Sequence, residues 1–352
     1  MPELPHLLYK QKQVTQLGNL HLFGLLLPLF VLVIINRFIM AKKFTFIFAN
    51  LFFVVINAQD FQFTQFYASP VYLNPAFAGS EYCPRVCLNY RNQWPNISGT
   101  YVTYCVSYDQ YVRALAGGIG IIVNTDDQAK GTLKTTSANF IYAYNATVNR
   151  TFSIKASLQA GYFQKNLDRT KLNFGDMIDP RRGFVWNTSE NIPSQTKINA
   201  DFSAGLLGYS KRYFFGIAVS HLTQPDEGLL GVSKLPAKFT AHAGGVIAIE
   251  RGGESSISPN ILFQQQQKFI QLNLGLYYVK GVFVVGLWYR NNDAVIVLIG
   301  IKNKQLKFGY SYDVTVSKLA GKSAGSHEIS MQIQFRCKKP AIKYRPIDCP
   351  SF

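Results

Sequence analysis

Residues 84–337 are divided into short segments in which apolar and polar side chains alternate. In residues 152–162, the even-numbered side chains from Phe152 to Tyr162 are apolar, whereas the odd-numbered ones are Ser, Lys, Ser, Gln and Gly. Residues 306–313 and 329–335 repeat this pattern. Because successive side chains of a strand point to opposite faces, the alternation predicts strands with one apolar face. A soluble β-sandwich also alternates, so the pattern alone leaves both architectures open.

The number and spacing of these segments favour a closed barrel. An even number of antiparallel strands brings both ends of a barrel to one side of the membrane, where the turns are short. The long connections, 166–197, 222–236 and 314–325, all fall on the opposite side. We therefore predict an all-β fold, a transmembrane antiparallel β-barrel of about 14 strands over residues 84–337. The predicted strands are 84–94, 99–110, 115–124, 135–148, 150–165, 198–210, 211–221, 237–250, 256–264, 268–280, 281–291, 293–302, 304–313 and 326–337.

Composition and charge agree with a barrel in a membrane. Charged residues make up 16% of the chain and aromatic residues 14%, which suits aromatic girdles around an apolar band. Without residues 1–58, which hold 5 basic and 1 acidic side chains, 31 Lys and Arg remain against 18 Asp and Glu, a net charge of +13. The basic residues are scattered, so we expect no nucleic acid and favour outer-membrane lipid headgroups or acidic protein partners.

Residues 1–58 are predicted to be an upstream extension followed by a cleaved signal peptide. Met40 and the lysines that follow it supply a start and a positive region, Phe44–Ile56 is apolar, and Asn57-Ala58 offers a small-residue site, so we predict cleavage after Ala58. An earlier apolar run, Leu20–Ile35, is either an inner-membrane anchor or lies upstream of the true start at Met40. We favour the start at Met40, since a barrel protein must leave the inner membrane.

A leader over residues 59–83 precedes the barrel, and a tail over residues 338–352 follows it. The leader begins QDFQFTQFYASPVYLNPAFAG, in which two prolines and a glycine exclude a regular helix or a central strand. We expect an irregular, aromatic-rich segment that packs on something else, on the periplasmic side. The tail holds three prolines and four basic side chains and is expected to be an extended periplasmic segment or a disordered terminus.

The leader resembles the start of the mature chain in the PorP/SprF family of Bacteroidetes outer-membrane proteins. Further stretches that resemble this family cover nearly all of residues 59–352, among them Leu172–Pro180, Phe215–His221 and Gly309–Asp313. The resemblance implies an outer-membrane barrel of type IX secretion and gliding motility. It also implies two kinds of partner, namely periplasmic components of that machinery and an exported adhesin with a C-terminal sorting domain. The leader positions that carry it are Gln62, Gln65, Phe66, Tyr67, Pro70, Leu73, Asn74, Pro75, Ala76 and Gly79.

Candidate sites are of the partner-binding kind, from the leader, the longest outer loop and the tail. In that loop, two arginines next to exposed aromatic side chains suit protein contact, although packing over the barrel mouth is an equal alternative. Cys83 precedes the first predicted strand, Cys337 ends the last one, and Cys349 lies in the tail that follows. A disulfide between two of these three cysteines is expected, without a defined pairing. The partner-binding candidates are Gln62, Tyr67, Asn74, Pro75, Arg181, Arg182, Trp186, Lys338, Lys339, Lys343 and Arg345.

No catalytic, cofactor or metal site is predicted. His327 and Glu328 are adjacent in a strand and must point to opposite faces, which favours separate structural roles. Asp126-Asp127 is expected in a solvated outer turn, and Gly117–Gly120 lacks the context of a nucleotide-binding loop and suits a strand bend or close packing. The functional alternatives to an assembly protein are a passive pore or small-solute transporter and, less favoured, a periplasmic β-sandwich with a membrane anchor.

Overall fold

The structure is a computed structural model that describes residues 60–97, 99–190, 195–229, 231–250, 254–316 and 323–337. The predicted upstream extension and signal peptide (1–58) and the predicted tail (338–352) lie outside the described residues. Within the described part of the chain, no helix is long and apolar enough to cross a membrane.

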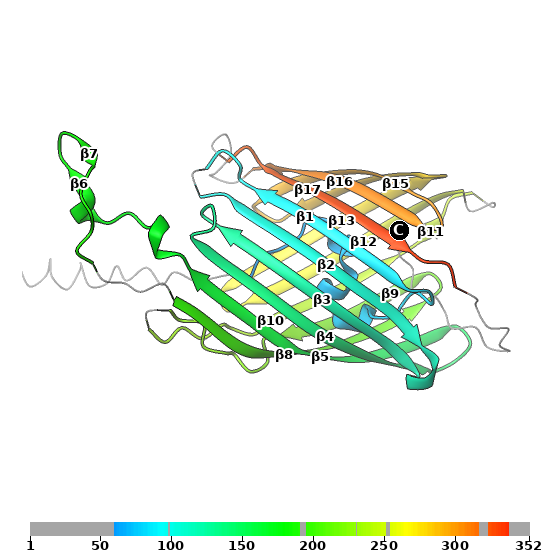
Figure 1. Ribbon diagram of the computed structural model, residues 1–352. Coiled ribbons are helices and arrows are strands. Elements are labelled where there is room, and N and C mark those ends of the chain that lie inside the picture. Colours follow the sequence, from blue (N-terminus) through cyan, green and yellow to red (C-terminus); the bar gives the residue numbers. More distant parts are fainter. Residues whose placement is uncertain are drawn as a thin grey trace, which may run out of the picture. The chain divides into compact units, whose positions relative to one another are not determined.

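Fourteen long strands form a closed antiparallel barrel (Figure 1), which confirms the predicted fold. Neighbours in sequence pair with one another, and the pairing of β1 with β17 and of β10 with β12 closes the cylinder. The strands are β1 (Arg85–Gln93), β2 (Tyr101–Val112), β3 (Gly117–Gln128), β4 (Leu133–Thr147), β5 (Phe152–Leu167), β8 (Gln195–Ser210), β9 (Tyr213–Ser220), β10 (Lys238–Gly245), β12 (Ser255–Gln266), β13 (Phe269–Lys280), β14 (Phe283–Arg290), β15 (Ala294–Lys302), β16 (Leu306–Thr315) and β17 (Ser326–Gln334).

The shorter elements lie at the ends of these strands. β11 (Ile247–Ala248) follows β10 and pairs with β12, whereas β6 (Ile178–Asp179) and β7 (Gly183–Phe184) form a separate hairpin. Single 3-10 turns occur at η3 (Arg113–Leu115), η4 (Arg169–Lys171) and η5 (Gly175–Met177). The remaining elements, η1 (Phe66–Ala68), α2 (Pro70–Leu73) and η2 (Pro75–Phe77), precede the first strand.

The barrel wall is polar inside and apolar outside. In β5, Lys155 is 1% exposed and Ser153 and Ser157 are buried, whereas Leu158 is 68% exposed. A water-soluble barrel or sandwich buries its apolar face, so this inverted burial requires hydrocarbon around the wall. The alternation predicted for residues 152–162 is therefore confirmed, with the apolar face toward lipid.

The two ends of the barrel differ in their connections. At the end where β1 begins and β17 finishes, the turns are short, as between Ser210 and Tyr213. The opposite end carries the long connections β5–β8, β9–β10 and β16–β17, as predicted. Since outer-membrane barrels place short turns in the periplasm, we name the first the periplasmic end and the second the outer end.

One predicted loop is part of a strand. Asp126 and Asp127, which we expect in a solvated turn, pair within β3 with Thr135 and Lys134 of β4. Asp126 is buried on the inner face, where Thr103 and Gln128 donate hydrogen bonds to its carboxylate. The prediction was wrong because β3 continues past the apolar band, and its polar residues there look like a loop.

Candidate functional site in the barrel lumen

Residues 60–83, called the plug below, lie inside the barrel. The plug contains η1 (Phe66–Ala68), α2 (Pro70–Leu73) and η2 (Pro75–Phe77), which are visible within the cylinder in Figure 1. Pro70 and Pro75 each occupy the first helical position, where a missing N–H costs nothing, and each helical run ends within four residues. The segment is irregular and packs on another element, but that element is the inner wall. It lies in the lumen from the outer end inward (Figure 1), whereas the sequence predicts it on the periplasmic side.

Aromatic contacts fix the plug to one side of the lumen. The rings of Phe66 and Trp288 lie 5.0 Å apart in an edge-to-face arrangement, and those of Tyr67 and Phe214 lie 5.4 Å apart. Phe77 stacks on His242 at 5.3 Å. Such pairs contribute about 0.5–1.5 kcal/mol each beyond the area that they bury. The aromatic residues of the plug therefore form a core with β9, β10 and β14.

The first described residue of the plug, Asp60, is held at the outer end. Its carboxylate lies 2.9 Å from Nε2 of His221 and 3.8 Å from Nζ of Lys238, and its backbone N–H donates to Gln266. His221 also forms an ion pair with Asp201 through Nδ1, at 2.9 Å. Burial by itself lowers the pKa of His221, but the two carboxylates outweigh it and raise that pKa to about 10. His221 is thus a cation clamped between two acidic groups.

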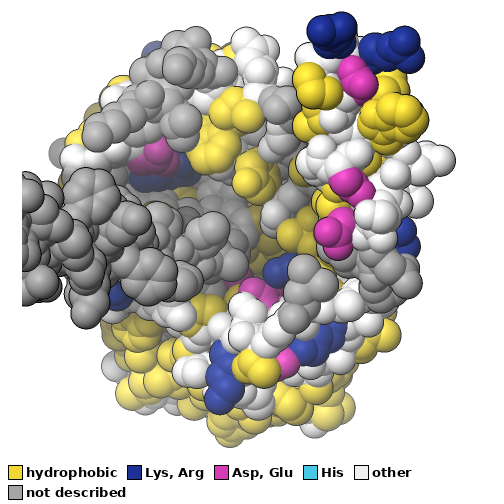
Figure 2. All heavy atoms as spheres, turned by 90° about the vertical axis from the view of Figure 1, so that its left-hand side faces the viewer, with side chains coloured by type: hydrophobic (Ala, Val, Ile, Leu, Met, Phe, Trp, Pro, Cys, Tyr) yellow, Lys and Arg dark blue, Asp and Glu magenta, His cyan; other side chains and the backbone are white. Residues whose placement is uncertain are grey.

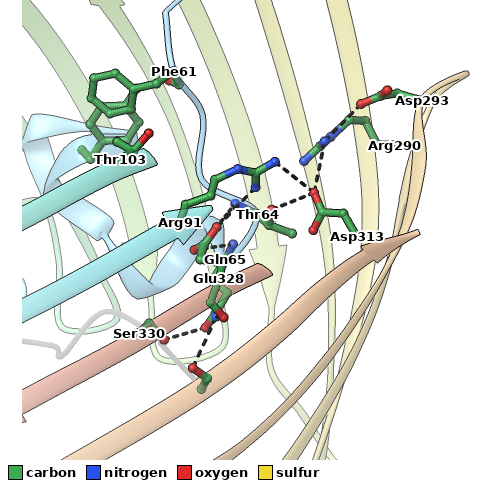
Figure 3. Close-up of polar contacts among 12 residues, drawn as sticks. Phe61, Thr64, Gln65, Arg91, Thr103, Arg290, Asp293, Asp313, Glu328 and Ser330 are labelled. Atoms are coloured by element: carbon green, nitrogen blue, oxygen red, sulfur yellow. Dashed lines mark hydrogen bonds and ion pairs between the residues drawn. The ribbon is translucent and has the colours of Figure 1, made fainter. Parts of the chain in front are cut away.

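The next contact is with a buried acid on β17 (Figure 3). The carboxylate of Glu328 accepts hydrogen bonds from the backbone N–H groups of Thr64 and Gln65. Arg91 bridges Glu328 at 3.3 Å and Asp313 at 3.0 Å, and Asp313 also accepts a bond from the Thr64 hydroxyl. A carboxylate that is buried must be paired and hydrogen-bonded, and this network satisfies that need.

Asn74 joins the middle of the plug to the wall. Its side-chain N–H2 group donates to the backbone carbonyls of Leu206 and Ile217 at 3.1 and 3.2 Å and lies 3.2 Å from Nε2 of His242. Its side-chain carbonyl accepts a bond from the N–H of Ala76, which starts η2. One fully buried amide therefore both caps a turn of the plug and connects it to β8, β9 and β10.

The periplasmic end of the plug is fixed by charged side chains of the wall. Lys155 donates to the carbonyl of Ala78 at 2.6 Å, and the N–H of Gly79 donates to Asp109 at 2.8 Å. Asp109 also accepts hydrogen bonds from Nε and Nη2 of Arg85, both at 2.9 Å. This two-pronged pairing of a guanidinium with a carboxylate is among the strongest polar contacts in proteins.

A glycine of the wall makes room for the plug. A Cβ atom on Gly118 would stand 2.0 Å from the carbonyl oxygen of Ala78, so no other residue fits this position of β3 without displacing the plug. Close packing, one of the two explanations offered for the Gly117–Gly120 cluster, is therefore what the structure shows. Beside the plug, a cavity of about 60 Å³ lies near Tyr67, Lys307 and Gln332.

The predicted partner-binding residues divide into three groups. Tyr67, Asn74 and Pro75 are buried between the plug and the wall, and Gln62 is half-buried, so a partner cannot reach the first three in the folded barrel. Arg181, Arg182 and Trp186 are exposed in and beside the β6–β7 hairpin. Lys338, Lys339, Lys343 and Arg345 of the tail lie outside the described residues.

Two of the three cysteines predicted to form a disulfide do so. Cys83 and Cys337 are joined by a disulfide, with Cα atoms 5.5 Å apart, and Cys349 lies outside the described residues. The bond links the end of the plug to the residues after β17. Cys87 and Cys105 are free and buried on the inner face.

Sequence reasoning missed the charged inner residues Arg91, His221, Arg290 and Asp313. In the sequence they look like the solvated polar face of separate strands, and nothing local shows that they meet. His327 and Glu328 do point to opposite faces, as predicted: His327 hydrogen-bonds Tyr310, whereas Glu328 binds the plug. Among the described residues, no group of three or more His, Cys, Asp or Glu side chains is placed to hold a metal ion.

Comparison with known proteins relates the chain to a secretion family. Solved structures with a similar outline include the outer membrane protein Omp33 of Acinetobacter baumannii (8% identity, 73% of this chain and 100% of that chain, TM-score 0.42) and the monoaromatic hydrocarbon channel CymD (13%, 77% and 93%, 0.41). A search of curated proteins found no match. The family model of the type IX secretion system membrane protein PorP/SprF matches residues 55–333. The chain is thus an outer-membrane β-barrel that belongs to the PorP/SprF family of type IX secretion system membrane proteins.

Proposed function

We propose that this barrel is a non-enzymatic assembly protein, which binds an exported adhesin with a C-terminal sorting domain at its outer end and secretion or gliding components at its periplasmic end. The observation that carries the proposal is the plug. It is connected to the wall from Asp60 at the outer end to the Cys83–Cys337 disulfide at the periplasmic end. A lumen that is occupied in this way suits a rigid protein that binds other proteins better than a channel for solutes.

The β6–β7 hairpin supports the outer contact. It extends past the strand ends on the side opposite the end of β17 (Figure 1). Phe184 and Trp186 are each 59% exposed, and Arg181 and Arg182 occupy the turn, where Asp179 accepts hydrogen bonds from both of their backbone N–H groups. Exposed aromatic side chains next to arginine are the composition that protein interfaces favour.

The base of this loop is ordered by its own hydrogen bonds. Asp176 accepts bonds from Thr188 and from the N–H and hydroxyl of Ser189, and Arg169 donates to the carbonyl of Glu190. The hydrogen bond from the backbone N–H of Ser189, together with the hydroxyl bonds, lowers the pKa of Asp176. A hairpin on an ordered base loses less conformational entropy when it binds a partner.

Co-purification from solubilised outer membrane tests the outer contact. Replacing Arg181 and Arg182 by Glu and Trp186 by Ala should remove the exported partner from the eluate, as identified by mass spectrometry. The matched control is Val232→Ala, which truncates an exposed apolar side chain, 83% accessible, in the β9–β10 loop. Retention of the same exported protein by both variants would remove the hairpin from the proposal.

The periplasmic contact is tested by deleting Lys338–Phe352. Barrel insertion, followed by heat-modifiable gel migration, should be unchanged, and the periplasmic components should no longer co-purify. Their continued presence would assign periplasmic docking to another part of the chain.

The rival function, a passive pore or solute transporter, is tested in a planar bilayer. The purified barrel should remain electrically silent, because its lumen is occupied. A large, steady open state in the unmodified protein would favour the pore.

A further inference from the structure

Arg290 and Asn273 face each other across β14 and β13 and point into the lumen near the outer end. They are directly opposite in the strand register, and both are buried. Arg290 uses Nη1 for Asp293 at 3.1 Å and for Asp313 at 3.4 Å, as Figure 3 shows. Within the described part of the chain its Nε and Nη2 have no hydrogen-bond partner, and neither has Nδ2 of Asn273. Three buried donor groups on two adjacent side chains are thus left without an acceptor.

A buried donor requires an acceptor, because an unmade hydrogen bond costs the desolvation free energy of that group. Elsewhere in this lumen the same two guanidinium atoms are used. Nε and Nη2 of Arg85 bind both oxygens of Asp109 at 2.9 Å. The Nε–Nη2 edge of a guanidinium matches the two oxygens of a carboxylate. Arg290 therefore presents the same Nε–Nη2 edge that binds a carboxylate in the Arg85–Asp109 pair.

The charges around Arg290 add a second requirement. Asp313 is paired through Oδ2 with Arg91 and Arg290, but its Oδ1 is buried and has no hydrogen-bond partner among the described residues. A ligand that also donates an N–H or O–H group to Asp313 would satisfy this acceptor. The site therefore fits a carboxylate that carries a hydrogen-bond donor beside it, as at the end of a peptide or in a small N-acyl amino acid.

The site lies at the outer end of the barrel. Arg290 is the last residue of β14, and the side chain of its partner Asp293 is 43% exposed. Viewed from that end, the barrel is hollowed, and its wall carries both acidic and basic side chains (Figure 2). Asp313, which Arg290 contacts, also holds the plug through the hydroxyl of Thr64.

We propose that Arg290 and Asn273 form a carboxylate-binding site at the outer mouth of the lumen, for ligands with an N–H or O–H group adjacent to the carboxylate. The site is independent of the assembly function proposed above, because it rests on the inner wall and not on the hairpin or the tail.

Ligand-observed NMR on the detergent-purified full-length barrel tests the site with N-acetylglycine, and with N-acetylglycinamide as the probe that lacks a carboxylate. We expect saturation transfer to N-acetylglycine and none to the amide. In Arg290→Gln, affinity should fall at least about tenfold, the loss expected for one charge-assisted hydrogen bond. Arg290→Lys should fall similarly, because lysine keeps the charge and lacks the fork.

Asn273→Ala should weaken binding by a smaller factor, and the control Arg212→Gln, at an exposed arginine of the periplasmic end, should bind as the unmodified barrel does. Heat-modifiable migration confirms that each variant is folded. N-acetyl-triglycine distinguishes the ligand source: binding equal to N-acetylglycine assigns the site to a chain terminus, and weaker binding assigns it to a small acid. Equal affinity in folded Arg290→Gln, equal binding of the amide, or no binding to the unmodified barrel overturns the proposal.

Discussion

Asn74 of the plug and Gly205 of β8 are in such close contact that a Cβ atom on Gly205 would stand 2.2 Å from Oδ1 of Asn74. Asn74 cannot move aside cheaply, since it is fully buried and its amide is bonded to Leu206, Ile217 and Ala76. The contact between the plug and the wall at this position therefore leaves no room for a methyl group on residue 205.

Gly205→Ala should destabilise the folded barrel by about 1–3 kcal/mol, the usual cost of overpacking. The measurement is the urea midpoint of the heat-modifiable gel band. Gly175→Ala is the control, because nothing lies within 4 Å of a Cβ at that loop position. A normal midpoint for Gly205→Ala would mean that the plug is not seated against β8.

Asp109 and Arg85 allow the polar attachment of the plug to be measured. Asp109→Ala leaves a buried guanidinium and the N–H of Gly79 without their acceptor, and should cost about 3–5 kcal/mol. The double variant Arg85→Met, Asp109→Leu should be less destabilised than Asp109→Ala, because no charge stays buried and unpaired. The single variants Arg85→Met and Asp109→Leu complete the comparison. If the double variant is destabilised by the sum of their two effects, the two residues act independently.

The barrel itself could be read from the sequence because its signal is local and repeated. Alternation along each strand gave both the strand and its lipid-facing side, as in residues 152–162, and the long loops gave the outer end. One error arose where the apolar band ends, at Asp126 in β3. Above the band both faces are polar, so strand and turn look alike.

The plug could be recognised as irregular but could not be placed. Pro70 and Pro75 exclude a strand by themselves, yet the contacts that put the segment in the lumen join residues far apart, as between Gln65 and Glu328, 263 positions away. Single inward glycines such as Gly118 were the available signal, since a strand gains nothing from glycine unless another backbone comes close.

The charge on His221 makes the outer attachment of the plug depend on pH. Its pKa is raised to about 10 in the folded barrel from an ordinary value of 6.5, so its contribution to stability is complete below pH 6.5 and is lost as the pH rises through about 10. For Asp60, burial acts against ionisation, but His221 and Lys238 lower its pKa, so its contribution is present above pH 3.8 and is lost in stronger acid.

The melting temperature of the unmodified barrel should therefore exceed that of His221→Gln at pH 6, by the equivalent of about 2 kcal/mol for a charge-assisted contact. This difference should shrink as the pH approaches 10. His327→Gln is the control, since His327 bonds Tyr310 away from the plug. A difference that stays constant from pH 6 to pH 10.5 would show that the His221 charge does not hold Asp60.

The direction in which the plug runs through the barrel predicts on which side of the membrane the mature N-terminus lies. Asp60 lies at the outer end, whereas Gly79 and Cys83 lie at the periplasmic end with Arg85 and Cys337. If the chain is cleaved after Ala58, as the sequence predicts, only Gln59 precedes Asp60, so we expect the new N-terminus on the outer side of the membrane.

An epitope tag inserted directly after Ala58 should thus be labelled by antibody on intact cells. The same tag after Phe352 serves as the control and should be labelled only after the outer membrane is opened, because β17 finishes at the periplasmic end. Surface labelling of the second tag alone would reverse the orientation of the barrel. If neither tag is labelled on intact cells, the N-terminus is not on the outer side of the membrane. That result would contradict the contacts of Asp60 with His221, Lys238 and Gln266 at the outer end.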